Sequence, residues 1–492
     1  MPKSTPIIDG KGVASIAKNL IYLLSGQGVY FVTRFFYVIV IARVFGPQIY
    51  GMINYGIAWY LLFLPLTRMG MEIVLSRDTG RNREKGDHTA VVTLALRIVS
   101  IIVVTVAYII ISLLFESDPA SRLMVLVFAF ALIGRSLAFW TGSVYIAYEC
   151  NQYFLRQQAI FRSLEVALGL VVIFIWREAL LVVAIHGLVW CLEAIYGLVI
   201  INRRVLVLRL EVKFADMSRV FTQGFALGVS MLLMGLPYQG PLVFFRHVVS
   251  SGDILGQLAL AMQILFILSN IPFALRGASL PVLSRSAIRK DGKDRVYAET
   301  MIRFSLLLGC LMALLGTAFA PWLTIQIFGT RYALAGDLIG PVLWLMIPFT
   351  ICQVLFSVLL AWKKDFQIFF GALIGAAFFV IIIFEAVGRY KAVGAIISAA
   401  GAMCLTTFYF IFLLRKYMAI DLFSALLKPG LAVVSTVVVF YSLSFAGPIV
   451  AVGGAFVFLF VICYWFECLT PQEIIWLRNS FVWIRRKVSF LK

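Results

Sequence analysis

Five arginines lie inside the long apolar stretches of this 492-residue chain, namely Arg34, Arg68, Arg97, Arg135 and Arg276. An arginine at the centre of a membrane helix costs about 2.5–3.5 kcal/mol on insertion scales, so it usually faces a polar cavity or a partner. Its guanidinium is a planar fork of hydrogen-bond donors that suits phosphate. The buried arginines therefore predict a cavity that binds an anion, and they disfavour a cationic ligand.

The sequence offers a nearby explanation for two of these arginines. Arg97 lies about two turns from one end of its apolar stretch, so we expect its side chain to reach the interface and to have a structural role. Arg68 is followed four residues later by Glu72. This spacing fits either a self-neutralised ion pair on one helix face or a position that lines the cavity.

The other three, Arg34, Arg135 and Arg276, have no acidic residue three or four places away. Each needs a partner from another helix. We therefore predict that a cationic cavity binds the substrate through Arg34, Arg68, Arg276 and Arg135.

Acidic residues are fewer inside the apolar stretches. Glu165 follows Arg162 by three residues, and a local ion pair is the simplest interpretation. Glu193 and His186 are seven residues apart on one helix face, which fits either a proton relay or packing against a neighbouring helix. Glu72, Glu165, Glu193 and His186 are the predicted candidates for ion coupling.

The segment that begins at Arg68 has a weaker copy at Arg276, RMGMEIVLSR against RGASLPVLSR. A proline precedes each arginine, and each copy closes its apolar run on a basic residue. The repetition indicates a duplicated helical lobe. Pro65, Pro272 and Pro237 are predicted hinges, because proline removes a helical hydrogen bond and permits bending.

The composition is that of a polytopic membrane protein. Hydrophobic residues make up 62% of the chain and charged residues 13%, whereas soluble domains are roughly half apolar and a quarter charged. The net charge of +19 lies in short connectors between apolar runs, so we expect no nucleic-acid partner. The cysteines form no CxxC pair and the histidines are scattered, so we predict no metal site and no cofactor.

A membrane-spanning helix needs about 20 apolar residues, and the runs show no strand-like alternation. We predict an all-α polytopic membrane protein with about fourteen transmembrane helices, arranged as two pseudo-repeated six-helix lobes plus two C-terminal helices. The expected spans are 19–42, 51–76, 90–115, 122–148, 157–177, 179–201, 220–247, 254–283, 298–326, 334–361, 367–386, 392–414, 429–446 and 449–468.

Most basic residues outside the spans fall on connectors of one side, so the positive-inside rule places both termini in the cytoplasm. The expected division is a cytoplasmic N-terminus (1–18), an N-lobe (19–201), a cytoplasmic linker (202–219), a C-lobe (220–414), a cytoplasmic connector (415–428), two further spans (429–468) and a basic cytoplasmic tail (469–492). Apolar and basic residues alternate in the tail, as in an interfacial helix.

The N-terminal pattern resembles a known family. It comprises Lys18-Asn19, Ala42-Arg43-Val44-Phe45-Gly46-Pro47, Tyr50-Gly51, Asn54 and the stretch 70–77. It is similar to the Wzx-type oligosaccharide flippases of the multidrug, oligosaccharidyl-lipid and polysaccharide exporter (MOP) superfamily. The resemblance implies alternating-access transport of an oligosaccharide on undecaprenyl diphosphate across the bacterial cytoplasmic membrane, for O-antigen (lipopolysaccharide) or exopolysaccharide assembly.

In related flippases of lipid-linked peptidoglycan precursors, arginines on the first, second and eighth helices hold the diphosphate. The resemblance implies this role for Arg34, Arg68 and Arg276. Arg34 departs from the pattern, because it stands farther from the Ala-Arg-x-Phe-Gly turn and no aspartate follows it. The implied partners are the lipid-linked oligosaccharide, membrane lipids and the polysaccharide polymerase machinery.

Two other classes compete with a flippase. A multidrug or metabolite cation antiporter of the same superfamily usually has twelve spans and needs buried carboxylates more than arginines. A membrane enzyme needs a sizeable loop that carries acid and base groups. The sequence has no such loop, so we expect no catalytic residues.

The cavity assignment predicts that Arg34→Ala and Arg276→Ala abolish export while the protein still inserts, whereas Arg97→Ala is tolerated. The measurement is export of lipid-linked oligosaccharide in cells that carry each variant. Equal, mild losses in all three would contradict the assignment.

Overall fold

The computed structural model describes residues 10–209, 212–289, 292–418, 420–421 and 423–468. These residues form helices and connectors, and no strand occurs among them. Twelve stretches within them are long and apolar enough to cross a membrane. Two of these stretches lie in α1 (Gly10–Arg68) and α13 (Asp365–Tyr417), and a non-helical residue breaks each of these helices. Counting each broken helix as two spans gives fourteen, as predicted.

The break in α1 confirms the turn that the Gly-Pro pair predicts. Gly46 has φ 73° and ψ 176°, a conformation that glycine adopts without the steric penalty of a side chain. Pro47 follows as the first residue of the next helical segment, where its missing N–H costs no hydrogen bond. The break in α13 falls at Lys391, which has φ 49°.

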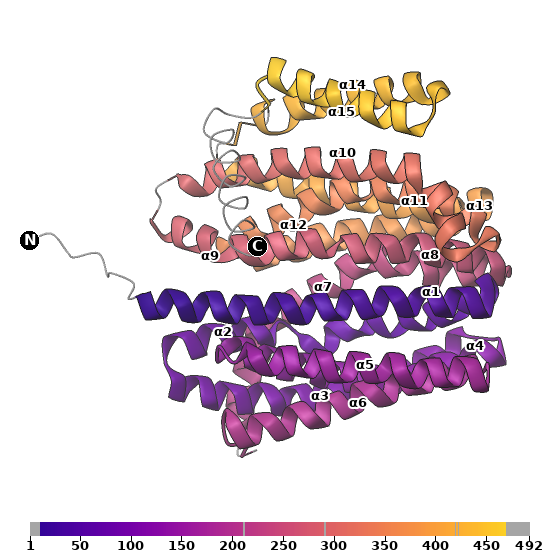
Figure 1. Cartoon of the computed structure of the whole chain (residues 1–492). Helices are drawn as coiled ribbons and strands as arrows, with labels where there is room; N and C mark the ends of the chain where they lie inside the picture. The colour runs from indigo at the N-terminus through magenta and orange to yellow at the C-terminus, as the bar shows by residue number, and fades with distance from the viewer. Residues whose placement is uncertain (1–9, 210–211, 290–291, 419, 422, 469–492) are drawn as a thin grey trace, which may run out of the picture. The chain divides into compact units, whose positions relative to one another are not determined.

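The chain divides into two compact units, Met1–Ala259 (unit 1) and Leu260–Lys492 (unit 2). Within unit 1, α1 packs against α5 and α7, and α4 packs against α6 (Figure 1). The unit contains α1, α2 (Met71–Arg81), α3 (Arg83–Phe115), α4 (Pro119–Ala147), α5 (Asn151–Ile175), α6 (Ala179–Arg204), α7 (Phe214–Val248) and the start of α8 (Gly252–Leu268).

Glycines bring α4 and α6 into backbone contact. A Cβ built on Gly134 would lie 2.4 Å from the Cys191 backbone nitrogen. Built on Gly187 it would lie 2.9 Å from Phe130, and on Gly197 2.6 Å from the Thr141 hydroxyl. Small residues allow membrane helices this close an approach.

The α3 helix shows how unit 1 suits an apolar surrounding. Ile102, Val106 and Ile110 are exposed and recur along one face, whereas Thr93 and Arg97 are buried on another. Polar side chains thus point into the unit and apolar ones point outward, as expected for a helix that faces lipid.

The predicted second span, 51–76, ends earlier than expected. Met69 (φ 44°) and Gly70 (φ 64°) break the helix after Arg68, and the separate helix α2 follows. The matching segment at Arg276 lies inside the uninterrupted helix α9. In both copies of the sequence repeat, a helix ends four residues after Leu-Ser-Arg. The copies differ at their first arginine, because the helix breaks directly after Arg68 but continues through Arg276.

Unit 2 contains the rest of α8 and the helices that follow it. The helical pattern is interrupted at Ser269 within the predicted span 254–283, and at Leu345 within 334–361, where the backbone dihedral angles remain helical. The elements are α9 (Asn270–Arg289), α10 (Lys293–Phe328), α11 (Ala333–Trp344), α12 (Met346–Ala361), α13, α14 (Lys428–Leu443), α15 (Pro448–Trp465), the 3-10 turns η1 (Thr330–Tyr332) and η3 (Ser444–Ala446), and the π turn η2 (Phe423–Leu427).

The two units meet after Ala259 in the chain, and α7 packs against α1 and α3 of unit 1. The predicted domain boundaries, with the linker at 202–219, stay a prediction. The predicted tail, 469–492, lies outside the described residues. The two pseudo-repeated lobes stay a prediction.

Gly134→Ala is expected to destabilise the protein by about 1–3 kcal/mol, because the added methyl group meets the α6 backbone, which has nowhere to move. Thermal melting of the purified protein in detergent measures the loss. Gly28→Ala is the control, because a Cβ there has no neighbour within 4 Å. Equal melting temperatures for the two variants would show that α4 and α6 are not in backbone contact.

Candidate functional site

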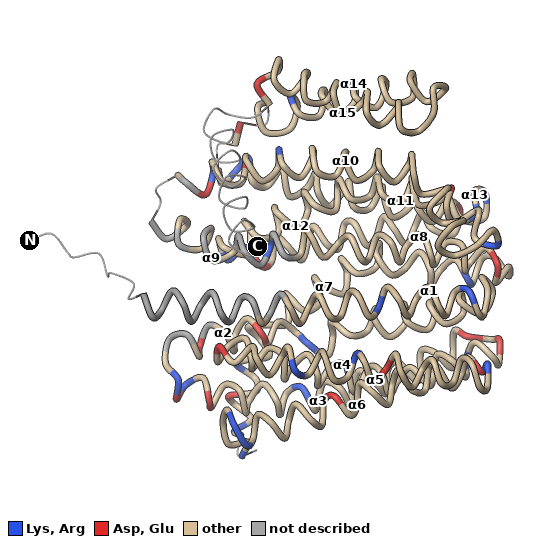
Figure 2. Tube along the Cα trace, viewed as in Figure 1, with Lys and Arg blue, Asp and Glu red and all other residues tan. Residues whose placement is uncertain are grey.

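Unit 1 holds a group of charged side chains buried between four helices. Figure 2 shows that Lys, Arg, Asp and Glu positions occur part-way along the helices as well as at their ends. We call this group the buried charge cluster. Its members come from α1, α4, α5 and α6: Arg34, Arg135, Arg162, Glu165, His186 and Glu193.

Glu165 is the centre of the cluster. Its Oε1 lies 2.6 Å from His186 Nδ1 and 3.9 Å from Arg34 Nη1. Its Oε2 accepts a hydrogen bond from Arg162, which confirms the predicted local pair. The side chain is 5% exposed, so the carboxylate needs these donors to remain charged away from water.

Glu193 is held separately, from the other side of Arg162. It accepts hydrogen bonds from Arg162, from Gln157 Nε2 at 3.1 Å and from Gln158 Nε2 at 3.2 Å. The Arg162 guanidinium also lies 3.8 Å from the centre of the Trp190 ring. His186 and Glu193 are therefore linked through α5, and not directly to each other as a two-residue relay would require.

Arg135 has an aromatic environment. Its Nη1 donates to the Tyr60 hydroxyl at 2.6 Å, and its guanidinium lies 4.8 Å from the centre of the Trp190 ring. The Tyr60 oxygen is also 3.1 Å from His186 Nε2. Aromatic faces stabilise a cation without neutralising it. Arg135 has no acidic residue three or four places away, which predicted partners from other helices, and Tyr60 and Trp190 are such partners.

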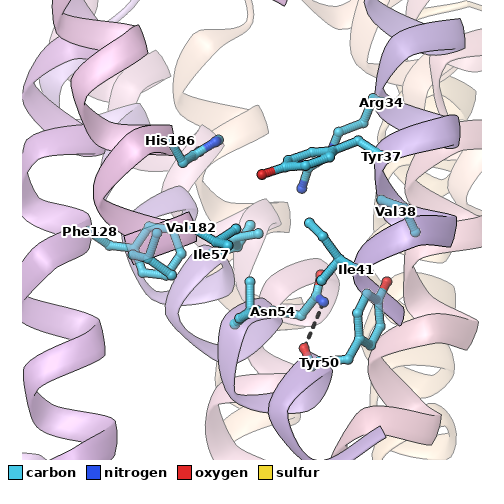
Figure 3. A pocket seen from close by; sticks show the side chains of 12 residues that line it. Arg34, Tyr37, Val38, Ile41, Tyr50, Asn54, Ile57, Phe128, Val182 and His186 are labelled. Carbon is cyan, nitrogen blue, oxygen red and sulfur yellow. Dashed lines mark hydrogen bonds between the residues drawn. The ribbon is translucent and has the colours of Figure 1, made fainter. Parts of the chain in front are cut away.

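Two small pockets open onto the cluster, each with room for about one water molecule. Arg34, Tyr37 and His186 line both of them. In the first pocket they point toward one another across one end, above apolar side chains such as Ile57 and Val182 (Figure 3). The second pocket is also lined by Tyr30, Thr33, Arg135, Arg162, Glu165, Val166 and Trp190.

The second pocket has more donors than acceptors. Tyr37 Oη, Arg135 Nε and Arg162 Nε are buried and have no hydrogen-bond partner among the described residues. Buried polar atoms in proteins are nearly always paired, and unpaired ones call for a water, an ion or a ligand. Such a surplus suits an acceptor-rich ligand such as a phosphate.

A second charged group lies at the end of α1. Glu72 Oε1 accepts from Arg68 Nε at 2.9 Å, which confirms the predicted pair, and from Arg97 Nη2 at 2.8 Å. Arg97 is fully buried, so the prediction that it reaches the interface is wrong. The turn at Met69 and Gly70 carries Glu72 on α2 to Arg97, a placement that a continuous helix would not give.

The Phe139 ring lies close to both charged groups. The Arg68 guanidinium is 4.8 Å from its centre, and the Arg135 guanidinium is 5.2 Å away. Arg68 therefore stands beside the buried charge cluster, although it does not line either pocket described above.

Arg276 lies in unit 2. Its Nη1 donates to Gln353 Oε1 at 3.0 Å, and its guanidinium lies 5.4 Å from the Phe273 ring and 5.0 Å from the Phe356 ring. The prediction that Arg276 shares one cavity with Arg34 concerns both units, and it stays a prediction.

The predicted hinge prolines lie within helices. Pro65 is in α1 and Pro237 is in α7, while Pro272 is the third residue of α9, after the break at Ser269. Their role as hinges stays a prediction.

The sequence reasoning missed Arg162 as a cluster residue, because its pair with Glu165 was assigned a purely local role. A signal was available. Gln158, Arg162 and Glu165 recur at intervals of four and three residues, which places them on one helix face. The contributions of Tyr37, Tyr60 and Trp190 had no comparable signal, because aromatic residues are common throughout the chain.

The chain has relatives among known protein families. The family model described as "Polysaccharide biosynthesis protein" matches residues 16–287. No curated protein matches the chain.

Several solved structures share the fold. The lipid II flippase MurJ, in an inward closed conformation, has a TM-score of 0.67 at 14% identity over 93% of this chain and 100% of that one. An outward-facing multidrug resistance MATE family transporter of the MOP superfamily has a TM-score of 0.63 at 12% identity, over 82% and 95%. A MOP superfamily transporter from Pyrococcus furiosus has a TM-score of 0.61 at 12% identity, also over 82% and 95%.

Glu72→Gln is expected to destabilise the protein by about 3–5 kcal/mol, because it leaves the buried Arg97 without a carboxylate. Arg97→Ala, expected from the sequence to be tolerated, should also lower the melting temperature, because it removes a fully buried side chain and one of the two cations that pair with Glu72. Thermal melting in detergent tests both variants. Glu385→Gln is the control, because its ion pair with Arg389 is exposed and contributes little. A Glu72→Gln protein that melts like this control would refute the shared role of Glu72.

Proposed function

Because this chain belongs to the polysaccharide biosynthesis protein family, we propose that it is a flippase for a lipid-linked oligosaccharide. The substrate is an oligosaccharide repeat unit on undecaprenyl diphosphate. The protein moves it from the inner to the outer leaflet of the bacterial cytoplasmic membrane, for O-antigen or exopolysaccharide assembly. The structure is that of a multi-pass membrane protein with the fold of MOP superfamily transporters.

The observation that carries the proposal is the donor surplus of the buried charge cluster. The cluster contains three guanidinium groups and two carboxylates, Arg135 contacts aromatic residues and not a carboxylate, and three buried donors have no partner among the described residues. A diphosphate has several charged acceptor oxygens, and guanidinium groups bind these with paired, charge-assisted hydrogen bonds. The cluster therefore suits the head of the substrate better than it suits an organic cation.

Its place inside the bundle supports a lipid-linked substrate. The diphosphate and its sugars must cross an apolar layer about 30 Å thick, while a polyprenyl tail is stable within that layer. Polar donors enclosed by helices with apolar outer faces can bind the charged head inside the protein, whereas the hydrocarbon of the bilayer cannot.

In the proposed mechanism, Arg34, Arg135 and Arg162 bind the diphosphate, and Arg68 and Arg276 contribute as the resemblance implies. Alternating access exposes the site to one side of the membrane and then to the other. Glu165, Glu193 and His186 are the candidates for coupling this change to an ion gradient. Both termini face the cytoplasm, and the product passes to the polysaccharide polymerase machinery.

A cation antiporter of the same superfamily is the alternative. Two buried carboxylates favour it, since a cation exporter needs such groups, and MATE transporters share the fold. Glu165 and Glu193 are both paired with Arg162, however, which leaves less negative charge for a cationic drug.

Arg135→Gln is expected to slow flipping by roughly 10–100-fold, because a hydrogen bond to a charged group contributes about 1.5–3 kcal/mol. The measurement is the leaflet distribution of lipid-linked oligosaccharide in cells that lack the protein, complemented with wild type or variant. Precursor should accumulate on the inner face without the protein, and wild type should release it.

Arg389→Gln is the control for this experiment, because that arginine is largely exposed and pairs only with a neighbour on its own helix among the described residues. It should restore flipping fully. If the precursor reaches the outer leaflet without the protein, and no other transporter replaces it, the flippase proposal is wrong.

A further inference from the structure

We propose that Glu165 is an internal anion that occupies the donors of the buried charge cluster when no substrate is bound, and that a phosphate group of the substrate displaces it. This inference rests on the proposed function. It explains why arginines that should line an open cavity surround a carboxylate instead.

The contacts of Glu165 are those that a phosphate would make. Donors reach its two oxygens from three helices: Arg34 from α1, Arg162 from α5 and His186 from α6. Carboxylate and phosphate oxygens are both acceptors for guanidinium groups. The same three donors would therefore serve a phosphate at this position.

The donors around Glu165 lie at different distances from its carboxylate. His186 Nδ1 is 2.6 Å from the carboxylate, but Arg34 Nη1 is 3.9 Å away, beyond hydrogen-bond distance. Arg34 also lines both pockets, and at 17% exposure it is the most accessible of the three donors. A phosphate that reaches the cluster from the side of the pockets, which must widen to admit it, would thus first meet the donor that Glu165 holds least firmly.

Glu193 provides the contrast. It carries the same charge and also pairs with Arg162, but two glutamine amides hold its other oxygen. Glu165 lines the second pocket, whereas Glu193 lines neither of the two pockets described. Glu193 thus secures α5 to α6 and does not exchange with a phosphate, whatever its part in ion coupling, and the exchangeable carboxylate is Glu165.

A displaced Glu165 would still have partners. Arg162 has a third donor, Nε, that is buried with no hydrogen-bond partner among the described residues, so it can bond the phosphate and still keep one carboxylate oxygen. The Tyr37 hydroxyl lines the same pocket and is buried with no hydrogen-bond partner among the described residues, so it can donate to the other oxygen. Gly169, one turn after Glu165, makes room for it, because a Cβ there would lie 2.0 Å from Tyr37 Oη.

The proposal has a quantitative consequence. A site whose open form is only a fraction of the population binds its ligand more weakly by that fraction. If Glu165 keeps the donors occupied for about nine-tenths of the time, removing its charge tightens diphosphate binding about tenfold. This gain in affinity should depend on the diphosphate group of the ligand and not on its lipid tail.

The test measures binding of farnesyl diphosphate to the purified full-length protein in detergent, for wild type, Glu165→Gln and Glu193→Gln. We expect Glu165→Gln to bind about tenfold more tightly than wild type and Glu193→Gln to remain within about twofold. Farnesol, which has the tail without the diphosphate, should show no gain in any variant.

Equal gains in Glu165→Gln and Glu193→Gln would overturn the proposal, because net charge alone would then explain them. Wild-type binding with no gain in Glu165→Gln would also overturn it, and would leave the proposed function intact. If none of the three proteins binds the diphosphate, the proposed function fails as well.

Glu165→Asp keeps the inference testable if Glu165→Gln does not fold. The shorter side chain retains the charge but brings the carboxylate less close to Arg34 and His186. An intermediate gain in farnesyl diphosphate affinity is expected. An affinity equal to that of wild type would contradict displacement.

Discussion

The structure depends on the cost of burying a guanidinium group away from water. Each buried arginine of unit 1 must recover its lost hydration from acceptors or aromatic faces on other helices, and this requirement fixes which helices meet. Arg162 of α5 pairs with Glu193 of α6, Glu165 of α5 contacts His186 of α6, and Arg135 of α4 donates to Tyr60 of α1. The charges that make the site useful for an anion are thus also what holds the four helices in register.

Much of the fold is readable from the sequence because membrane helices follow simple rules. Length and hydropathy predict the fourteen spans, and the Gly46–Pro47 pair predicts the first turn. The break at Met69 and Gly70 was not predicted, because a glycine in an apolar run fits close helix packing as well as a turn. The break places Glu72 on a separate helix, where it pairs with the buried Arg97.

The site was predicted less completely, and for a physical reason. Burial of a charge shows that a partner is needed, but not which of several helices supplies it. The sequence therefore selected Arg34, Arg135 and Glu165, which the structure places in the buried charge cluster, and it gave Arg162 only a local pair. Spacing along one helix reveals local pairs, whereas contacts such as that of Glu193 with Gln157 span 36 residues and depend on packing.

The glycine contacts between α4 and α6 limit how unit 1 can rearrange. The two helices approach each other closely at three levels, with backbone contacts at Gly134 and Gly187 and a side-chain contact with Thr141 at Gly197, and such packing opposes sliding of one helix past the other. Gly169 lets α5 pack closely against the Tyr37 side chain of α1. The bonds from Glu165 to His186, from Arg162 to Glu193 and from Arg135 to Tyr60 all cross the seam between these two pairs. Any sliding of the α4–α6 pair against α5 and α1 must therefore exchange these charge-assisted bonds, so the anion held between the two pairs would determine how easily they move.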